Sequence, residues 1–183
     1  MRRVNVDVER LETPRLVLRD WRASDLEDLV AMSADPEVMR YVGGVLDRPQ
    51  TWRQLALVVG HWALRGYGLW AVERKRDAAL VGRVGLWNPA GWPGLEVGWT
   101  LTRHAWGQGY ATEAAGAAMQ WAWTELNASE LVSVIHRENA ASIRVAERLG
   151  LRPRREGTFK GERCTIWGID RPGLGERTAP SGA

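Results

Sequence analysis

Two glycines, Gly107 and Gly109, stand between a strand-like run and an alanine-rich segment with helical spacing. The first turn of a helix carries free backbone N–H groups and the positive end of the helix dipole, so it binds anions, phosphate above all. Glycines just before that turn let a phosphate approach the backbone. The amides of residues 106–111 are therefore candidates for a phosphate site. A plain turn, in which the glycines only permit the bend, is the alternative.

A second helix start adds to this signal. Asn139 is a natural N-cap for the segment 140–149, and Ser142 lies in its first turn. Two helix N-termini on the same side of a sheet can hold the two ends of a long, phosphorylated ligand. The structural alternatives are simple capping by Asn139 and a solvated or locally bonded Ser142 hydroxyl.

Two other nucleotide-binding motifs fit poorly. The stretch GQGYAT half-matches the dinucleotide fingerprint G-x-G-x-x-G, but Thr112 replaces its third glycine and the preceding strand does not open a βαβ unit. The phosphate-loop sequence G-x-x-x-x-G-K-[ST] is absent from the sequence. A dinucleotide-binding oxidoreductase therefore stays a minor alternative.

Composition predicts an ordinary globular domain. The chain has 183 residues, 45% of them hydrophobic and 26% charged, and its net charge of +3 is too small to indicate nucleic-acid binding. No apolar run approaches the roughly 20 residues of a membrane span, and the N-terminus does not resemble a signal peptide. With a single cysteine, Cys164, no intrachain disulfide can form, which fits a reducing cytoplasm. We expect Cys164 to pack in the core.

The pattern of elements predicts one α+β domain over residues 11–170, between a flexible start at 1–10 and a flexible tail at 171–183. We expect a mixed sheet with helices on both faces, because strands and helices do not alternate regularly. The expected elements, in order, are a strand at 15–21, helices within 24–65, strands at 68–75, 79–89 and 94–102, a helix at 110–126, a strand at 130–136, a helix at 139–150, and strands at 151–161 and 162–170.

Residues 12–170 resemble the GNAT N-acetyltransferases, and within them the RimJ/RimL-like type that acetylates N-termini of ribosomal proteins. Four segments carry the resemblance in this order: ETPRLVLRDWRASDLEDL, LVGRVGLW, LEVGWTLTRHAWGQGYATEA and HRENAASIRVAERLGLRPR. The resemblance implies a mostly antiparallel central sheet whose strands splay at the coenzyme site. It also implies acetyl-CoA as the ligand.

The resemblance assigns coenzyme contacts to particular residues. The pyrophosphate would bind the hinge amides, and the pantetheine arm would pair with the backbone of the preceding strand. Asn139 and Ser142 would lie beside the arm. The implied coenzyme-binding residues are Val97, Trp99, Leu101, Trp106, Gly107, Gln108, Gly109, Tyr110, Ala111, Thr112, Asn139 and Ser142. Two positions depart from the family pattern. His104 stands at the first position of the coenzyme motif Q/R-x-x-G-x-G/A, and Ala146 stands where many members have a tyrosine that acts as the general acid.

Acetyl transfer to an amine requires a base, because an alkylamine has a pKa near ~10.4 and must lose a proton to react. Glu96 is the candidate, as the only acidic residue in the strand 94–102; a solvent-facing or arginine-paired glutamate is the alternative. Ser142 is the candidate donor to the leaving thiolate. A backbone N–H of Val97 or Trp99 can polarise the thioester carbonyl.

The acceptor is expected to be a protein N-terminus or a small amine, bound in a cleft walled by the segment 24–65. Four aromatic residues are candidates to line this cleft, with core packing as the alternative for each: Tyr41, Trp52, Trp87 and Trp92. No cluster has metal-ligand spacing, so no metal is expected. The sequence leaves open a non-catalytic acyl-CoA-binding domain, and a monomer or a homodimer.

Overall fold

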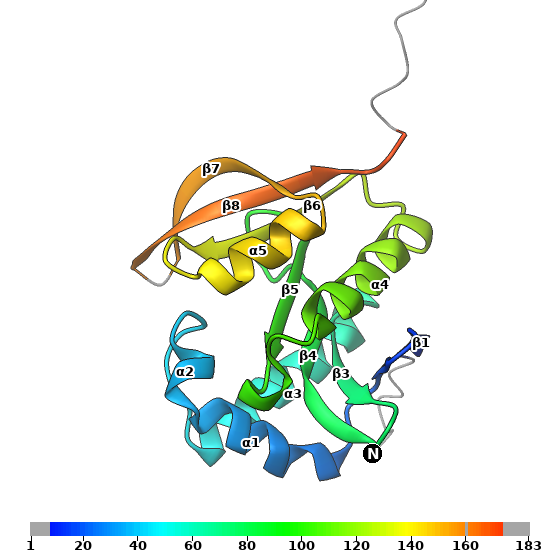
Figure 1. Cartoon of the computed structure of the whole chain (residues 1–183), viewed down its shortest axis with the longest axis vertical. Coiled ribbons are helices and arrows are strands. Elements are labelled where there is room, and N and C mark those ends of the chain that lie inside the picture. Colours follow the sequence, from blue (N-terminus) through cyan, green and yellow to red (C-terminus); the bar gives the residue numbers. More distant parts are fainter. Residues whose placement is uncertain (1–7, 160, 174–183) are drawn as a thin grey trace, which may run out of the picture.

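The structure, a computed structural model, describes residues 8–159 and 161–173 (Figure 1). Eight strands form one sheet in the order β1-β2-β3-β4-β5-β6-β8-β7. Every neighbouring pair is antiparallel except β5 and β6. The strands are β1 (Leu11–Glu12), β2 (Leu16–Arg19), β3 (Leu69–Arg74), β4 (Ala79–Trp87), β5 (Glu96–Leu101), β6 (Glu130–His136), β7 (Arg152–Phe159) and β8 (Glu162–Asp170).

Five α-helices and two 3-10 turns complete the described fold, and the order of α-helices and strands is the one that the sequence predicts, except for the unpredicted short strand β1. The helices are α1 (Leu26–Ala34), α2 (Pro36–Met39), α3 (Arg48–Arg65), α4 (Tyr110–Thr124) and α5 (Ala140–Arg148), with 3-10 turns at Ala23–Asp25 and Arg103–Ala105. The predicted α+β class, with a mixed and mostly antiparallel sheet, is confirmed. No helix in the described ranges is both long and apolar enough to cross a membrane.

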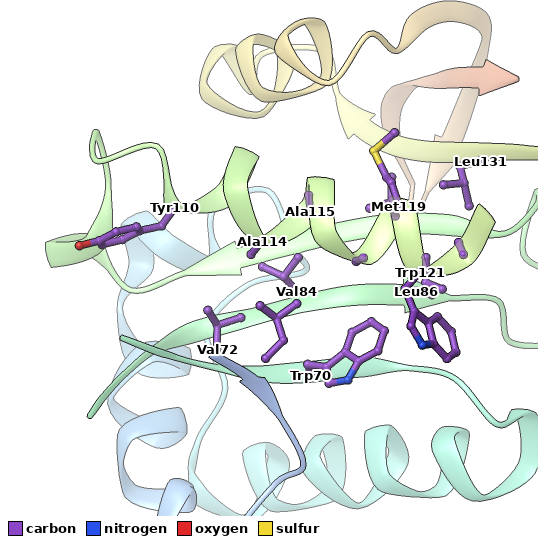
Figure 2. Close-up of a cluster of buried hydrophobic side chains, with 14 of the residues drawn as sticks. Trp70, Val72, Val84, Leu86, Tyr110, Ala114, Ala115, Met119, Trp121 and Leu131 are labelled. Atoms are coloured by element: carbon purple, nitrogen blue, oxygen red, sulfur yellow. The ribbon is translucent and has the colours of Figure 1, made fainter. Parts of the chain in front are cut away.

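Helix α4 packs closely on one face of the sheet because its inner stripe is alanine. Ala114, Ala115 and Ala118 are completely buried against β4 and β5 (Figure 2). At the end of this interface Trp121 meets Trp70 of β3 edge to face, with ring centroids 5.4 Å apart. Aromatic side chains bury the most apolar area per residue, so this cluster stabilises the helix that carries the glycine hinge at its start.

Helices α1 to α3 form a second layer next to the sheet (Figure 1). Helix α3 begins with a capping box, in which Asp47 accepts a hydrogen bond from the Gln50 amide and Gln50 bonds back to Asp47, and it ends at Gly66 in the left-handed conformation. Val58 from α3 and Arg83 from β4 line the same cleft. The second layer is therefore one wall of this cleft.

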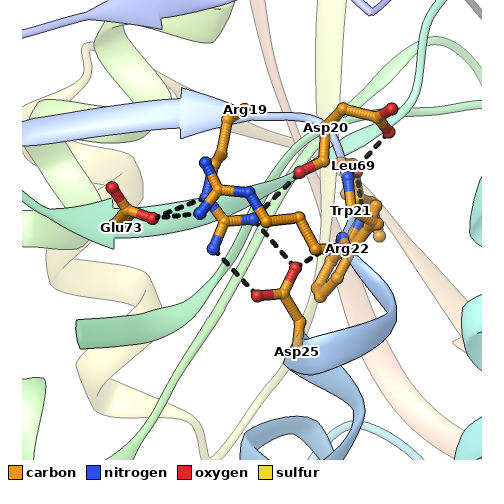
Figure 3. Close-up of polar contacts among 7 residues, drawn as sticks. All are labelled: Arg19, Asp20, Trp21, Arg22, Asp25, Leu69 and Glu73. Carbon is orange, nitrogen blue, oxygen red and sulfur yellow. Dashed lines mark hydrogen bonds and ion pairs between the residues drawn. The ribbon is translucent and has the colours of Figure 1, made fainter. Parts of the chain in front are cut away.

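A buried ionic cluster fixes the start of α1 against the sheet (Figure 3). Arg19 at the end of β2 donates two hydrogen bonds of 2.8 Å to Asp25 and one of 2.7 Å to Glu73 of β3. Burial alone would raise the pKa of Asp25, but hydrogen bonds from Arg19 and from the Arg22 amide outweigh it and lower that pKa. The Arg22 guanidinium adds a second cation, 3.1 Å from Glu73, so the two positive and two negative charges cancel and the cluster is structural.

The two ends of the domain are tied to its core where they are described. The Glu9 carbonyl accepts a hydrogen bond from Trp70, and its carboxylate accepts one from Trp121, both at 2.7 Å. At the other end the Arg171 amide donates to the Ser129 carbonyl at 2.8 Å. Ordered contacts thus extend slightly beyond the predicted limits of 11 and 170. The remaining parts of the predicted flexible ends, 1–7 and 174–183, lie outside the described residues.

Candidate active site

Strands β5 and β6 separate immediately after they meet. Their parallel pairing has one register pair, Glu96 with Val132, next to a hydrogen bond of 2.9 Å from the Val132 amide to the Leu95 carbonyl. The backbone N–H and C=O groups of successive residues in a strand point to opposite sides. Since the Leu95 carbonyl points to β6, the backbone groups of Val97, Trp99 and Leu101 point to that side as well. The predicted splay of two strands of the sheet is confirmed, and the edge of β5 that opens toward β6 belongs to the residues predicted for the pantetheine arm.

Glu96 lies where the two strands part. Its Oε1 accepts a hydrogen bond from the Val134 amide of β6 at 3.0 Å, and its Oε2 accepts one from Trp92 Nε1 at 2.6 Å. The carboxylate thus bridges the splay. Burial raises the pKa of Glu96 to about 7, against these two hydrogen bonds, and no arginine pairs with it among the described residues. The solvent-facing and arginine-paired alternatives are both excluded.

Ser142 and Asn139 meet the splay from the start of α5. Asn139 caps the helix by accepting a hydrogen bond of 3.1 Å from the Ser142 amide. The Ser142 hydroxyl oxygen accepts a hydrogen bond of 3.2 Å from Trp99 Nε1 on β5. Since Trp99 uses a lone pair of that oxygen, the hydroxyl proton stays available for donation into the cleft.

The glycine hinge has the expected shape. Gly107 and Gly109 both adopt positive φ, at 72° and 78°, and Gly109 is the N-cap of α4. Within the described residues, the amides of 107–112 donate to no protein acceptor, whereas the Trp106 amide already bonds to the Arg103 carbonyl at 3.1 Å. The buried Thr112 hydroxyl also has no protein partner. The available donors are thus those of 107–112, and Trp106 contributes none from its backbone.

A brace that the sequence interpretation missed holds the hinge in place. Glu113 of α4 accepts hydrogen bonds from the Thr13 hydroxyl and the Arg15 guanidinium, both at 2.6 Å. Arg15 also donates to the Gln108 carbonyl at 2.8 Å. The brace neutralises the acid nearest the hinge, so Glu113 does not repel an anion there. The bonded residues lie 93 or more positions apart in sequence, which hides them from any local pattern.

A cleft of about 790 Å³ runs from the splay toward the second layer. Three of the four aromatic candidates line it, namely Tyr41, Trp87 and Trp92. Tyr41 stacks on His136 of β6 at 4.8 Å, and Trp87 stacks on His61 of α3 at 4.4 Å. Trp52 does not line the cleft, because α3 turns it to solvent and leaves it 58% exposed. The expectation that Trp52 lines the acceptor cleft is therefore wrong.

The fit of this geometry to a known family decides the identity. Residues 15–152 match the model of the acetyltransferase (GNAT) domain. The chain belongs to the GNAT acetyltransferase family. It is 34% identical over 150 residues to the uncharacterized Bacillus subtilis protein YkkB, with 78% of this chain and 84% of that protein covered.

Solved GNAT-type structures share the whole architecture. The acetyltransferase from Agrobacterium tumefaciens str. C58 superposes with a TM-score of 0.83 at 28% identity, over 93% of this chain and 99% of that one. The spermidine N-acetyltransferase from Vibrio cholerae, solved with CoA and spermine, has the same fold at 17% identity, with a TM-score of 0.71 over 86% of this chain and 96% of that one. This GNAT chain is an acetyl-CoA-dependent acetyltransferase, which removes the dinucleotide-binding alternative.

Proposed function

We propose that this GNAT enzyme transfers the acetyl group of acetyl-CoA directly to a primary amine, with Glu96 as the base. The observation that carries the proposal is the buried Glu96 carboxylate, whose pKa of about 7 suits a base at neutral pH. It bridges β5 and β6 at the point where the sheet opens, inside the cleft. A carboxylate placed there takes a proton from an amine directly or through one water.

Hydrogen-bonding groups without a protein partner support the proposed binding site for acetyl-CoA. The unpartnered amides of 107–112 and the Thr112 hydroxyl suit the pyrophosphate, and the open edge of β5 at Val97, Trp99 and Leu101 suits the pantetheine arm. Because the Leu101 carbonyl already accepts from Trp106 Nε1 at 2.9 Å, the open part of this edge centres on Trp99. Asn139 and Ser142 then lie beside the arm.

In the proposed reaction the amine nitrogen attacks the thioester carbonyl carbon, the C–S bond breaks, and the thiolate leaves with the electron pair. The Trp99 amide on the open edge is placed to stabilise the charge on the carbonyl oxygen. The Ser142 hydroxyl, oriented by Trp99 Nε1, donates a hydrogen bond to the thiolate. Cys164 also lines the cleft, but burial raises the pKa of its thiol, which favours direct transfer over a cysteine-bound intermediate.

The test is thiol release from acetyl-CoA with a panel of primary amines, in the wild type and in Glu96→Gln. We expect the substitution to lower kcat/KM by about 10²- to 10⁴-fold at neutral pH, the usual worth of a general base. The wild-type rate should rise with pH through about 7 as Glu96 ionises.

Two controls make the test specific. CoA affinity of Glu96→Gln, measured by titration, should stay unchanged, because the coenzyme contacts lie elsewhere. Glu138→Gln removes a solvated acid at the rim of the cleft and should leave the rate as it was. An unaltered rate in Glu96→Gln would remove Glu96 from the mechanism.

A further inference from the structure

Arg83 of β4 is a buried charge inside the cleft. Its side chain shares the cleft wall with Gly98 and Thr100 of β5, it pairs in register with Thr100, and the residue is 7% exposed. Burial lowers the pKa of Arg83 to about 10, so the guanidinium is still charged at neutral pH. A buried cation in a protein normally has an anion beside it.

Arg83 has no such anion in the described part of the chain. None of the described carboxylates forms an ion pair or hydrogen bond with it, and no other described group accepts a hydrogen bond from its guanidinium. The other two buried arginines do have partners, since Arg19 pairs with Asp25 and Glu73, and Arg74 pairs with Asp77 at 2.7 Å. Arg83 is thus the exception among the buried arginines described.

A second unpartnered polar group lines the same cleft. The side-chain carbonyl oxygen of Gln54 in α3 is buried and accepts no hydrogen bond. It does not satisfy Arg83, and Arg83 does not satisfy it. Buried polar groups in proteins are nearly always hydrogen-bonded, so two without a protein partner in one cleft point to a ligand that bonds to both.

The position of Arg83 separates it from the proposed base. Trp87 pairs with Glu96 across the β4–β5 ladder, and Arg83 precedes Trp87 by four residues on the same face of β4. Four residues of extended strand span about 13 Å. The two charges also have no mutual effect on the pKa of either group. The cleft therefore has an acid at one end and a free cation at the other.

We propose that Arg83 binds a carboxylate of the acceptor, so that the substrate is a small amine that also carries a carboxylate. That the acceptor carries an amine rests on the proposed function; that it carries a carboxylate does not. The amine of the acceptor lies at Glu96, and its carboxylate accepts hydrogen bonds from the Arg83 guanidinium. The Gln54 side-chain oxygen accepts a hydrogen bond from a donor between these two ends. A polyamine such as the spermine seen in the Vibrio cholerae structure would place a cation against an unpaired guanidinium.

Binding is measured first, because it does not depend on turnover. With the protein saturated with CoA, calorimetric titration compares ε-aminocaproate, hexylamine and hexanediamine, which share one chain length. We expect the wild type to prefer ε-aminocaproate, and Arg83→Met to lose about 10- to 100-fold in its affinity, the worth of a charge-assisted hydrogen-bonded pair. Hexylamine affinity should be the same in both proteins.

The matched control is Arg40→Met, which removes an exposed arginine from the rim of the same cleft. It should keep the preference for ε-aminocaproate. An equal loss in Arg40→Met would mean that the general field of the cleft selects the anion, and the proposal would be wrong. It would also be wrong if hexanediamine bound best or if Arg83→Met kept full affinity.

Further measurements distinguish a carboxylate from a phosphate as the anion at Arg83. They also distinguish failure of the carboxylate site from failure of the proposed acetyl transfer. A fall in CoA affinity in Arg83→Met would assign the guanidinium to a coenzyme phosphate and overturn the inference. Displacement of ε-aminocaproate by inorganic phosphate at equal concentration would overturn the choice of a carboxylate. If Arg83-dependent binding is found but no probe releases thiol from acetyl-CoA, amine acetylation fails while the carboxylate site is supported.

Discussion

Two polar regions of this enzyme handle buried charge in opposite ways. In the cluster of Arg19, Asp25 and Glu73, each charge is in contact with its opposite, and the pKa of Asp25 is lowered. In the cleft, Arg83 and Glu96 are equally buried but stand apart, and the pKa of Glu96 is raised to about 7. Charges that the chain neutralises hold the fold together, whereas the two that it keeps apart are the ones that we propose act on the acceptor.

The largest effect should come from breaking the paired region. Arg19→Met leaves the buried Asp25 without its cation and leaves Glu73 with the exposed Arg22 alone, so we expect the free energy of unfolding to fall by about 3–5 kcal/mol. Denaturant unfolding at neutral pH measures this.

The control for that measurement is Arg22→Met. Arg22 contacts the same Glu73 oxygen at 3.1 Å, but its side chain is 60% exposed. Its loss should therefore cost under about 1 kcal/mol. Equal effects of the two substitutions would mean that burial does not distinguish the two arginines, and the contrast between the regions would lose its basis.

The raised pKa of Glu96 predicts how the free energy of unfolding changes with pH. Its pKa is about 7 in the folded protein and near 4.5 in an unfolded chain. Between these values the folded state keeps a proton that the unfolded state has lost, so this group makes the protein less stable as pH rises, by about 1.4 kcal/mol per pH unit. Above pH 7 the effect is constant.

Glu96→Gln removes this titration while keeping the shape of the side chain. The free energy of unfolding of the variant minus that of the wild type should therefore increase from pH 5 to pH 7 and then level off. A difference independent of pH would show that the carboxyl titrates normally, and Glu96 would then resemble the neutralised acids of the paired region.

The difference between the two regions also explains what the sequence could predict. The glycine hinge, the Asn139 cap of α5 and the alternating strands are local patterns that neighbouring residues predict correctly. Glu96 is a candidate from the sequence because it is the single acid in its strand. The splay of β5 and β6 was expected from the family resemblance alone, since the residues that meet there, Glu96 and Val132, are far apart in sequence.

Tertiary placement accounts for what the sequence missed. An aromatic residue in a helix is as able to face solvent as a cleft, so Trp52 was misplaced. Arg83 looks like any arginine in a hairpin strand, because its burial depends on β5 and α3 together. The brace of Arg15 on Glu113 spans 98 residues, and no pattern within a single element reveals it.

The smallest expected effect is the most direct test of the contrast. Arg83→Met removes a buried charge that has no partner, and methionine keeps the apolar stem of the side chain. The free energy of unfolding should therefore stay within about 1 kcal/mol of the wild type, or increase, because the cost of burying a charge disappears. Arg19→Met, the same substitution in the paired region, provides the comparison under identical conditions. A loss of about 3 kcal/mol or more in Arg83→Met would mean that a protein carboxylate neutralises Arg83 in solution, which would place it with Arg19 as a structural charge and leave the cleft without a cation for the acceptor.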